Sequence, residues 1–224
     1  MCYPCNRITK RGTGFVMAEF SSLLGIAPGL TAIIGSGGKT TLLFRLAQEL
    51  ARKGRVIVTT TTHIRQPEDF PFALRAAGQG RVCVGTPLPD GKLSAPEQSM
   101  QELASLADYV LVEADGAARH PLKVHASHEP VIPENAREVI CGVGASGLYR
   151  LAQEVVHRPE LFLQRTGSAV ATPEAVARVL EEEHFHTQVL INQAETQPAA
   201  ARELAQRLSG PVRLACVQKG EIIC

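Results

Sequence analysis

The chain of 224 residues contains no tryptophan, and aromatic residues make up only 4% of it. Surfaces that stack nucleic-acid bases need aromatic side chains, so this scarcity argues against a single-stranded nucleic-acid binder. A strong charge of either sign is also missing, because 23 Lys and Arg residues oppose 22 Asp and Glu residues and leave a net charge of +1. We therefore expect neither nucleic acid nor a membrane as a partner.

Long apolar runs are absent as well. No stretch approaches the roughly 20 apolar residues that span a bilayer. The start of the sequence lacks the apolar centre of a signal peptide. Six cysteines in a chain of this length do not make a disulfide scaffold, and we expect Cys83, Cys141 and Cys216 to be small buried hydrophobes. These absences favour a cytoplasmic protein.

The first residues differ from the rest in composition. Residues 1–16 carry three cations and no acid, and Cys2 and Cys5 have the spacing of a redox pair or half a zinc site. A role for this pair, and for the terminal Cys224, stays open. We interpret residues 1–17 as a flexible leader, with Met17 as an alternative start, and residues 18–224 as a single domain.

Apolar runs alternate with amphipathic stretches along most of the chain. This alternation predicts a three-layer α/β fold with a mostly parallel sheet and helices on both faces. The expected strands are 29–34, 55–60, 81–85, 108–114, 137–143, 187–192 and 212–217. One expected helix begins at Lys39, and others cover 68–78, 95–106, 159–165, 173–184 and 197–208.

A glycine-rich turn joins the first expected strand to the helix at Lys39. Glycines let backbone N–H groups approach a phosphate, and a helix start adds partial positive charge. Lys39 would reach the β- and γ-phosphates, and the Thr40 hydroxyl would bind Mg²⁺. The predicted nucleotide-binding residues of this turn are Gly35, Ser36, Gly37, Gly38, Lys39, Thr40 and Thr41.

The spacing of this turn departs from the usual phosphate loop. The common motif G-x-x-x-x-G-K-[ST] would need glycine at Ile33, whereas the spacing here is the shorter G-x-x-G-K-T-T. A similar short loop occurs in amino-acid ligases of cell-wall synthesis. The physical elements of a P-loop NTPase-like fold are nevertheless present, and we expect ATP or GTP with Mg²⁺ as cofactors.

A second motif places carboxylates at the end of the expected strand 108–114. P-loop enzymes use an acid at such a position to hold Mg²⁺ or to orient water. We expect Asp115 to hold magnesium together with Thr40, and Glu113 to lie behind it or to position water. With Lys39, these two acids are the predicted catalytic residues.

Polar side chains elsewhere are candidates for a substrate site or lid. His63 follows the strand 55–60, and residues 119–130 concentrate cations and imidazoles directly after the acidic strand. The candidates are His63, Arg119, Lys123, His125, His128 and Glu129. A zinc site among His120, His125 and His128 is an alternative, although their spacing matches no zinc signature. At the tip of the strand 187–192, Asn192 is a candidate contact to the nucleotide base.

Taken together, the segments GSGGKTT, VTTTTH, VEADGAARHPLKVHASHEPVIP, VHRPE and LINQAE resemble the YqeC-type accessory proteins of selenium-dependent molybdenum hydroxylases. The resemblance covers roughly residues 20–217. It implies a nucleotide-binding protein that serves the maturation of a selenium-dependent molybdenum hydroxylase as its client. Gln193 replaces a lysine that is usual in the related Asn-Lys-x-Asp motif, which counts against guanine selectivity.

Three hypotheses follow. The favoured one is a Mg²⁺-dependent nucleoside triphosphatase that acts as a maturation factor. The first alternative is an ATP-dependent small-molecule kinase or ligase, and the second is a cofactor-binding chaperone without hydrolysis.

Overall fold

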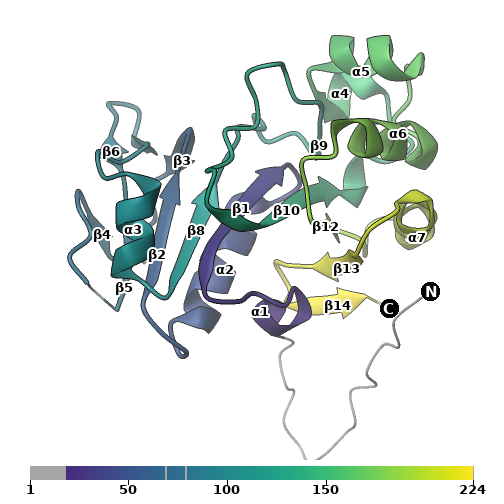
Figure 1. Cartoon of the computed structure of the whole chain (residues 1–224). Coiled ribbons are helices and arrows are strands. Elements are labelled where there is room, and N and C mark those ends of the chain that lie inside the picture. Colours follow the sequence, from purple (N-terminus) through teal and green to yellow (C-terminus); the bar gives the residue numbers. More distant parts are fainter. Residues whose placement is uncertain (1–18, 69, 79, 224) are drawn as a thin grey trace, which may run out of the picture.

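The computed structural model describes residues 19–68, 70–78 and 80–223. The expected leader at residues 1–17, the Cys2 and Cys5 pair, and Cys224 lie outside these ranges. Within them, the dominant element is a nine-stranded sheet with β1 at its centre (Figure 1). None of the helices in the described ranges has the length and apolar character needed to cross a bilayer.

The strands of the main sheet pair in parallel, except at one edge where β13 and β14 are antiparallel. Their spatial order is β14 (Glu221–Ile223), β13 (Val212–Cys216), β12 (Gln188–Asn192), β10 (Ala136–Gly144), β1 (Gly29–Gly35), β8 (Tyr109–Glu113), β2 (Val56–Thr60), β5 (Arg81–Val84) and β4 (Phe72–Ala73). Strands this apolar need cover on both faces.

Helices supply that cover (Figure 1). They are α1 (Phe20–Leu23), α2 (Lys39–Leu50), α3 (Met100–Leu106), α4 (Ala152–Val155), α5 (Pro159–Thr166), α6 (Pro173–Glu183) and α7 (Pro198–Arg207). Because side chains alternate along a strand, β1 serves both faces. Its Ile33 joins the core under α1 and α2, whereas Ala32 and Ile34 join the core under α4 to α7. Leu30 packs in a third cluster with α3. The predicted three-layer α/β fold is confirmed.

The predicted helix at 68–78 is wrong. Pro71 falls inside it and would break a helix, and the chain instead forms β4, in which Phe72 pairs in parallel with Cys83 of β5. The helix predicted at 95–106 begins only at Met100, where the Ser99 hydroxyl accepts a hydrogen bond from the Glu102 amide in a capping box. Cys83, Cys141 and Cys216 are buried, as predicted.

Short strands were not foreseen from the sequence. A small antiparallel sheet contains β3 (His63–Arg65), β7 (Lys92–Ser94) and β6 (Thr86–Pro87). In addition, β9 (Leu122–Lys123), inside the expected loop after the acidic strand, pairs with β11 (Val156–His157). A 3-10 turn, η1 (Ala145–Gly147), follows β10. These pieces are two or three residues long, too short for a periodic pattern to reveal them.

The register of the main sheet assembles the predicted motifs. Glu113 of β8 lies opposite Ile33 of β1 on one side and opposite Thr60 of β2 on the other. The glycine-rich turn, the two acids and the threonines after β2 therefore meet at the carboxyl edge of the sheet, where ligands of parallel α/β proteins bind.

Candidate functional site

The turn between β1 and α2 is built on three glycines in left-handed backbone. Gly35, Gly37 and Gly38 adopt positive φ angles of 84°, 70° and 107°, which residues with a side chain rarely tolerate. Helix α2 then begins at Lys39, as predicted. Among the described residues, none accepts a hydrogen bond from the amides of Gly37, Gly38 or Lys39. Three donors at a helix start thus remain available to an anion.

One flank of the turn is fixed by close packing against β10. A Cβ atom at Gly37 would lie 2.3 Å from the amide nitrogen of Gly144. This distance is far shorter than van der Waals contact, so position 37 has no room for a side chain. The Ser36 amide donates to the Gly142 carbonyl at 2.8 Å, and the Ser36 hydroxyl donates to the Pro121 carbonyl at 2.8 Å. The turn therefore cannot shift toward β10.

Asn192 completes this flank. Its amide nitrogen donates to the Gly37 carbonyl at 2.6 Å, and its amide oxygen accepts from the Val217 amide at 2.8 Å. The side chain is buried. Both the nitrogen and the oxygen of the side-chain amide are hydrogen-bonded to backbone groups. A contact from Asn192 to a nucleotide base would therefore require one of these two hydrogen bonds to break. Asn192 thus links the glycine-rich turn to the end of β13.

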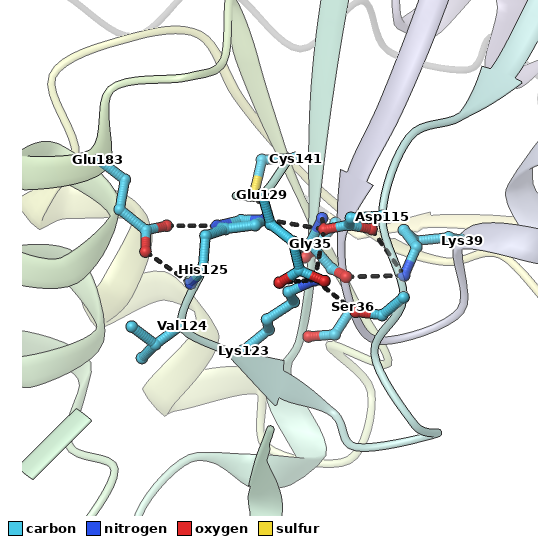
Figure 2. Close-up of polar contacts among 12 residues, drawn as sticks. Gly35, Ser36, Lys39, Asp115, Lys123, Val124, His125, Glu129, Cys141 and Glu183 are labelled. Atoms are coloured by element: carbon cyan, nitrogen blue, oxygen red, sulfur yellow. Dashed lines mark hydrogen bonds and ion pairs between the residues drawn. The ribbon is translucent and has the colours of Figure 1, made fainter. Parts of the chain in front are cut away.

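Lys39 lies inside the site instead of extending into solvent. Its ammonium group donates to the Gly35 carbonyl at 2.7 Å and lies 3.1 Å from Asp115 Oδ1 and 3.9 Å from Glu113 Oε1. The side chain is only 5% exposed. The lysine thus contacts both predicted acids at once (Figure 2 shows its contact with Asp115).

Asp115 is fully buried and surrounded by donors. Its Oδ2 accepts from the Gly35 amide at 2.7 Å and from His125 Nε2 at 2.8 Å, and Lys123 Nζ lies 3.2 Å away. Its Oδ1 has no hydrogen-bond donor among the described residues, because the nearby Lys39 ammonium forms an ion pair without hydrogen-bond geometry. Burial alone would raise the pKa of Asp115, but the His125 hydrogen bond and the two lysine charges outweigh it, and the net pKa is lowered.

Glu113 has a different environment. The Thr40 hydroxyl donates to its Oε2 at 2.9 Å. Burial raises the pKa of Glu113, and the nearby Lys39 charge and Thr40 hydrogen bond only partly oppose this. The backbone carbonyl of Glu113 accepts from the Thr60 hydroxyl at 2.8 Å and the Thr61 amide at 3.1 Å. The hydroxyl that was expected to bind magnesium therefore pairs with Glu113.

The segment after β8 divides into buried and exposed parts. Lys123 is 1% exposed and lies 3.1 Å from Glu129, which also forms an ion pair with Arg158 of the turn before α5. Lys123 further donates to the Gly116 carbonyl. In contrast, Arg119 and His128 are exposed. The structure thus brings Lys123 and Glu129 to the site and leaves Arg119 and His128 at the surface.

His125 is held between two carboxylates. Its Nε2 lies 2.8 Å from Asp115 Oδ2, and its Nδ1 lies 2.6 Å from Glu183 Oε2 (Figure 2). Burial alone would lower the pKa of His125, but the hydrogen bonds to these two acids outweigh it, and the net pKa is raised. Glu183 also forms an ion pair with Arg165 of α5 at 2.9 Å.

Sequence reasoning missed Glu183 and Arg165. Glu183 is the last of three successive glutamates at the end of α6, and nothing local distinguishes it from its neighbours. The imidazoles proposed for zinc are dispersed: His120 stacks on His157 and His128 is exposed. Within the described ranges, no three His, Cys, Asp or Glu side chains lie close enough together to hold a metal ion.

An open depression lies on the β2 side of the site, with a volume of about 490 Å³. It is lined by Thr61, Thr62, His63, Ser94, Ala95, Gly116 and Glu129. The depression adjoins the site, because its lining residue Thr61 donates to the Glu113 backbone carbonyl, its lining residue Glu129 pairs with Lys123, and Gly116 follows Asp115 in the chain. His63 therefore lies on this wall and not among the buried charges.

Comparisons with known proteins identify the family of the chain. The family model of the YqeC protein matches residues 31–160, a range that contains the glycine-rich turn, both acids and the Lys123 to Glu129 segment. The chain is also 34% identical over 178 residues to the uncharacterized protein YqeC of Escherichia coli K12. That alignment covers 68% of this chain and 65% of the relative, so the chain spans slightly less than two thirds of the relative's length. The chain belongs to the YqeC family.

Proposed function

We propose that the protein binds a nucleoside triphosphate with Mg²⁺ at the turn between β1 and α2, and hydrolyses it. The observation that carries this proposal combines two features: the amides of Gly37, Gly38 and Lys39 have no acceptor among the described residues, and a buried lysine lies next to two acids. Helix starts with free amides favour phosphate, and a lysine adds a point charge for its oxygens.

Phosphate binding changes the partners of Lys39. Its ammonium group now neutralises Asp115 at 3.1 Å, and a polyphosphate would compete for that charge. Asp115 keeps Lys123 and His125 when Lys39 turns toward phosphate, so its carboxylate stays compensated. This redundancy lets the lysine move without leaving an isolated buried charge, which would be costly.

The residues present fit a magnesium ion. Mg²⁺ in nucleotide sites takes one or two protein oxygens and completes its shell with phosphate and water. The Thr40 hydroxyl and the Glu113 carboxylate, which are 2.9 Å apart, are the donors we assign to it. We assign Glu113 because the Thr40 hydroxyl already donates to its carboxylate, whereas Oδ2 of Asp115 is held by Lys123, His125 and the Gly35 amide. When bound, the ion would neutralise charge on the β- and γ-phosphates.

The biological role that fits this activity is a maturation factor for a selenium-dependent molybdenum hydroxylase. Support comes from membership of the YqeC family together with the resemblance of segments such as VEADG and VHRPE. Nucleotide binding and hydrolysis would switch the loop between a nucleotide-bound and a nucleotide-free state, and a client protein would distinguish the two states. A chaperone that binds nucleotide without hydrolysis is the variant of this role that a hydrolysis assay separates.

The depression beside the acids favours a second candidate, a small-molecule kinase or ligase. Its volume of about 490 Å³ is that of a typical ligand pocket. Among the described residues that line it are three hydroxyls, one imidazole and one carboxylate, and no Lys or Arg. Such a lining suits a neutral or positively charged polar acceptor better than an anionic one.

The test is calorimetric titration of the full chain with ATP and with GTP, each with Mg²⁺, alongside Lys39→Ala. Lys92→Ala is the matched control, because Lys92 is exposed and pairs with Asp90 away from the loop. We expect saturable binding by the wild type and by Lys92→Ala, and its loss in Lys39→Ala while the variant stays folded. Equal binding by Lys39→Ala would contradict the proposal.

Product analysis separates the two candidates. With ATP and a series of neutral, cationic and anionic acceptors, a maturation NTPase yields ADP and inorganic phosphate in equal amounts, accelerated by its client. A kinase instead yields ADP and a phosphorylated acceptor, and a ligase yields a ligated compound in addition to ADP and phosphate or AMP and pyrophosphate. The lining predicts such a product from the neutral or cationic members.

A further inference from the structure

A continuous chain of buried contacts joins the phosphate loop to the helices on one face of the sheet (Figure 2). It begins at the Gly35 amide and Lys39, passes through Asp115 and His125, and ends at Glu183 of α6. Glu183 is 4% exposed at its side chain, and it accepts from both the His125 amide, at 2.8 Å, and the His125 ring. Glu183 thus fixes the backbone and the ring of His125 together.

We propose that Glu183 is a positioning residue of the phosphate loop: it orients His125, His125 orients Asp115, and Asp115 holds Gly35 and Lys39 in place. Glu183 lies 68 positions beyond Asp115 in the chain, and its hydrogen bonds within the described residues go to His125 and Arg165 and not to the loop. Its role in nucleotide binding rests on the function proposed above, whereas its effect on Gly35 does not.

The groups around His125 support this direction of action. Asp115 faces it from the end of β8, Glu183 from α6, and the Phe185 ring meets its edge at 5.6 Å between ring centroids. From α5, Arg165 donates to the His125 carbonyl at 3.1 Å and pairs with Glu183. The imidazole therefore has one arrangement in which both ring nitrogens and both backbone groups are bonded. A fully bonded buried group of this kind is rigid.

This series of contacts can transmit a change in either direction between the phosphate loop and α6. If phosphate draws Lys39 away, Asp115 relies more on His125, and the His125 to Glu183 contact with α6 becomes tighter. A partner that displaced α5 or α6 would in turn loosen Asp115 and, through it, the Gly35 amide. The helices α5 and α6 are therefore the elements to which this series of contacts connects the loop.

Hydrogen exchange at the Gly35 amide tests the proposal in the nucleotide-free protein. Glu183→Gln removes the charge and keeps the size, and Glu182→Gln makes the same change at an exposed neighbour on α6. We expect Glu183→Gln to accelerate exchange at Gly35 by about 10-fold relative to the amides of Ala32 and Ile33 in the same strand, and Glu182→Gln to leave it unchanged. Glu183→Asp, which keeps the charge, should recover part of the protection.

Two outcomes would overturn the proposal. One is unchanged exchange at Gly35 in Glu183→Gln; the other is acceleration of all three strand amides by one common factor, which is what a merely structural role produces. As a second readout, ATP affinity should fall about 3- to 10-fold in Glu183→Gln and not in Glu182→Gln. If the wild type binds no nucleotide, the function proposed above fails, while the exchange result still decides the role of Glu183.

Discussion

The two flanks of the glycine-rich turn are held by different forces. Toward β10 and β12, the turn is fixed by backbone contact and neutral hydrogen bonds, with Gly37 against Gly144 and its carbonyl on Asn192. Toward β8, it is held by charges, with Lys39 and Gly35 on Asp115. The first flank forbids movement, whereas the second consists of ion pairs for which a phosphate or a cation can compete.

The difference shows where a response to ligand can arise. A ligand cannot replace close packing or backbone hydrogen bonds with its own contacts, so we expect the β10 flank to stay fixed when a ligand binds. Charges are exchanged readily when a stronger partner arrives. The open depression is also on the β8 and β2 side, so the flank that is able to change is the one that faces a second ligand. Four substitutions test this contrast, from the largest expected effect to the smallest.

Gly37→Ala should produce the largest loss of stability. The new Cβ would meet the Gly144 amide at 2.3 Å, and the backbone at Gly37 has a φ of 70°. Left-handed backbone and overpacking together predict a cost of about 2 to 5 kcal/mol in the free energy of unfolding, measured by denaturant titration. Gly167→Ala is the matched control, since Gly167 also has a φ of 70° but no atom within 4 Å of the added Cβ. Equal losses in both would show that the β10 flank is not tightly packed.

Asn192→Ala should come next. It leaves the Gly37 carbonyl and the Val217 amide without their partner in a buried position. We expect a loss of about 2 to 4 kcal/mol in denaturant unfolding, because each orphaned backbone group carries its own desolvation penalty. Gln197→Ala, which removes a single bond to the Leu148 carbonyl, should cost less. If Asn192→Ala were as stable as the wild type but lost nucleotide selectivity, Asn192 would be a base contact after all.

Thr40→Val tests the charged flank with a change of nearly equal size. It removes the hydrogen bond to Glu113, for which we expect a stability loss of about 1 kcal/mol. Because Thr40 is an assigned magnesium ligand, the dependence of ATP affinity on Mg²⁺ concentration should disappear in calorimetry. Thr41→Val, at the next and exposed position, should keep that dependence. A Thr40→Val protein that still requires Mg²⁺ would remove Thr40 from the metal site.

The smallest expected effect is a change in the pH dependence of stability. The pKa of His125 is raised above its ordinary 6.5, mainly by hydrogen bonds to Asp115 and Glu183 that outweigh burial. Charged His125 therefore stabilises the fold fully below pH 6.5, and this contribution is lost as pH rises through the higher folded pKa. His125→Gln should lower the free energy of unfolding more at pH 6 than at pH 9, as measured by denaturant titration at the two pH values. Parallel profiles for the wild type and His125→Gln would contradict the assigned charge.

Local patterns predicted most of the fold. The strand before Gly35 and the helix from Lys39 follow from an apolar run, three glycines and an amphipathic face, all of which are contiguous in the chain. The predicted start of a helix at residue 173 also has a local cause, because the Thr172 hydroxyl accepts a hydrogen bond from the Ala175 amide and caps α6. The region around Pro71 was misread because an apolar spacing there resembles a helix while tertiary pairing with β5 makes a strand.

The candidate site was predictable only in part, for the same reason. Lys39, Glu113 and Asp115 stand at strand ends, where the pattern alone brings side chains together. The place of Asn192 beneath the loop depends on β12 being two strands from β1, which no local signal encodes. The contact between Glu183 and His125 depends on how α6 packs. In the sequence, nothing distinguishes Glu183 from the two glutamates before it.

The hydrogen bond from Asn192 to the glycine-rich turn also has a consequence for biosynthesis. The Gly37 carbonyl is secured by a residue 155 positions later, and that residue is in turn secured by Val217. While the ribosome is still producing the last third of the chain, the Gly37 carbonyl lacks the side chain that holds it. A nascent chain would thus complete the turn of the proposed nucleotide site in one late step, when β12 and β13 join the sheet, and not gradually as it emerges.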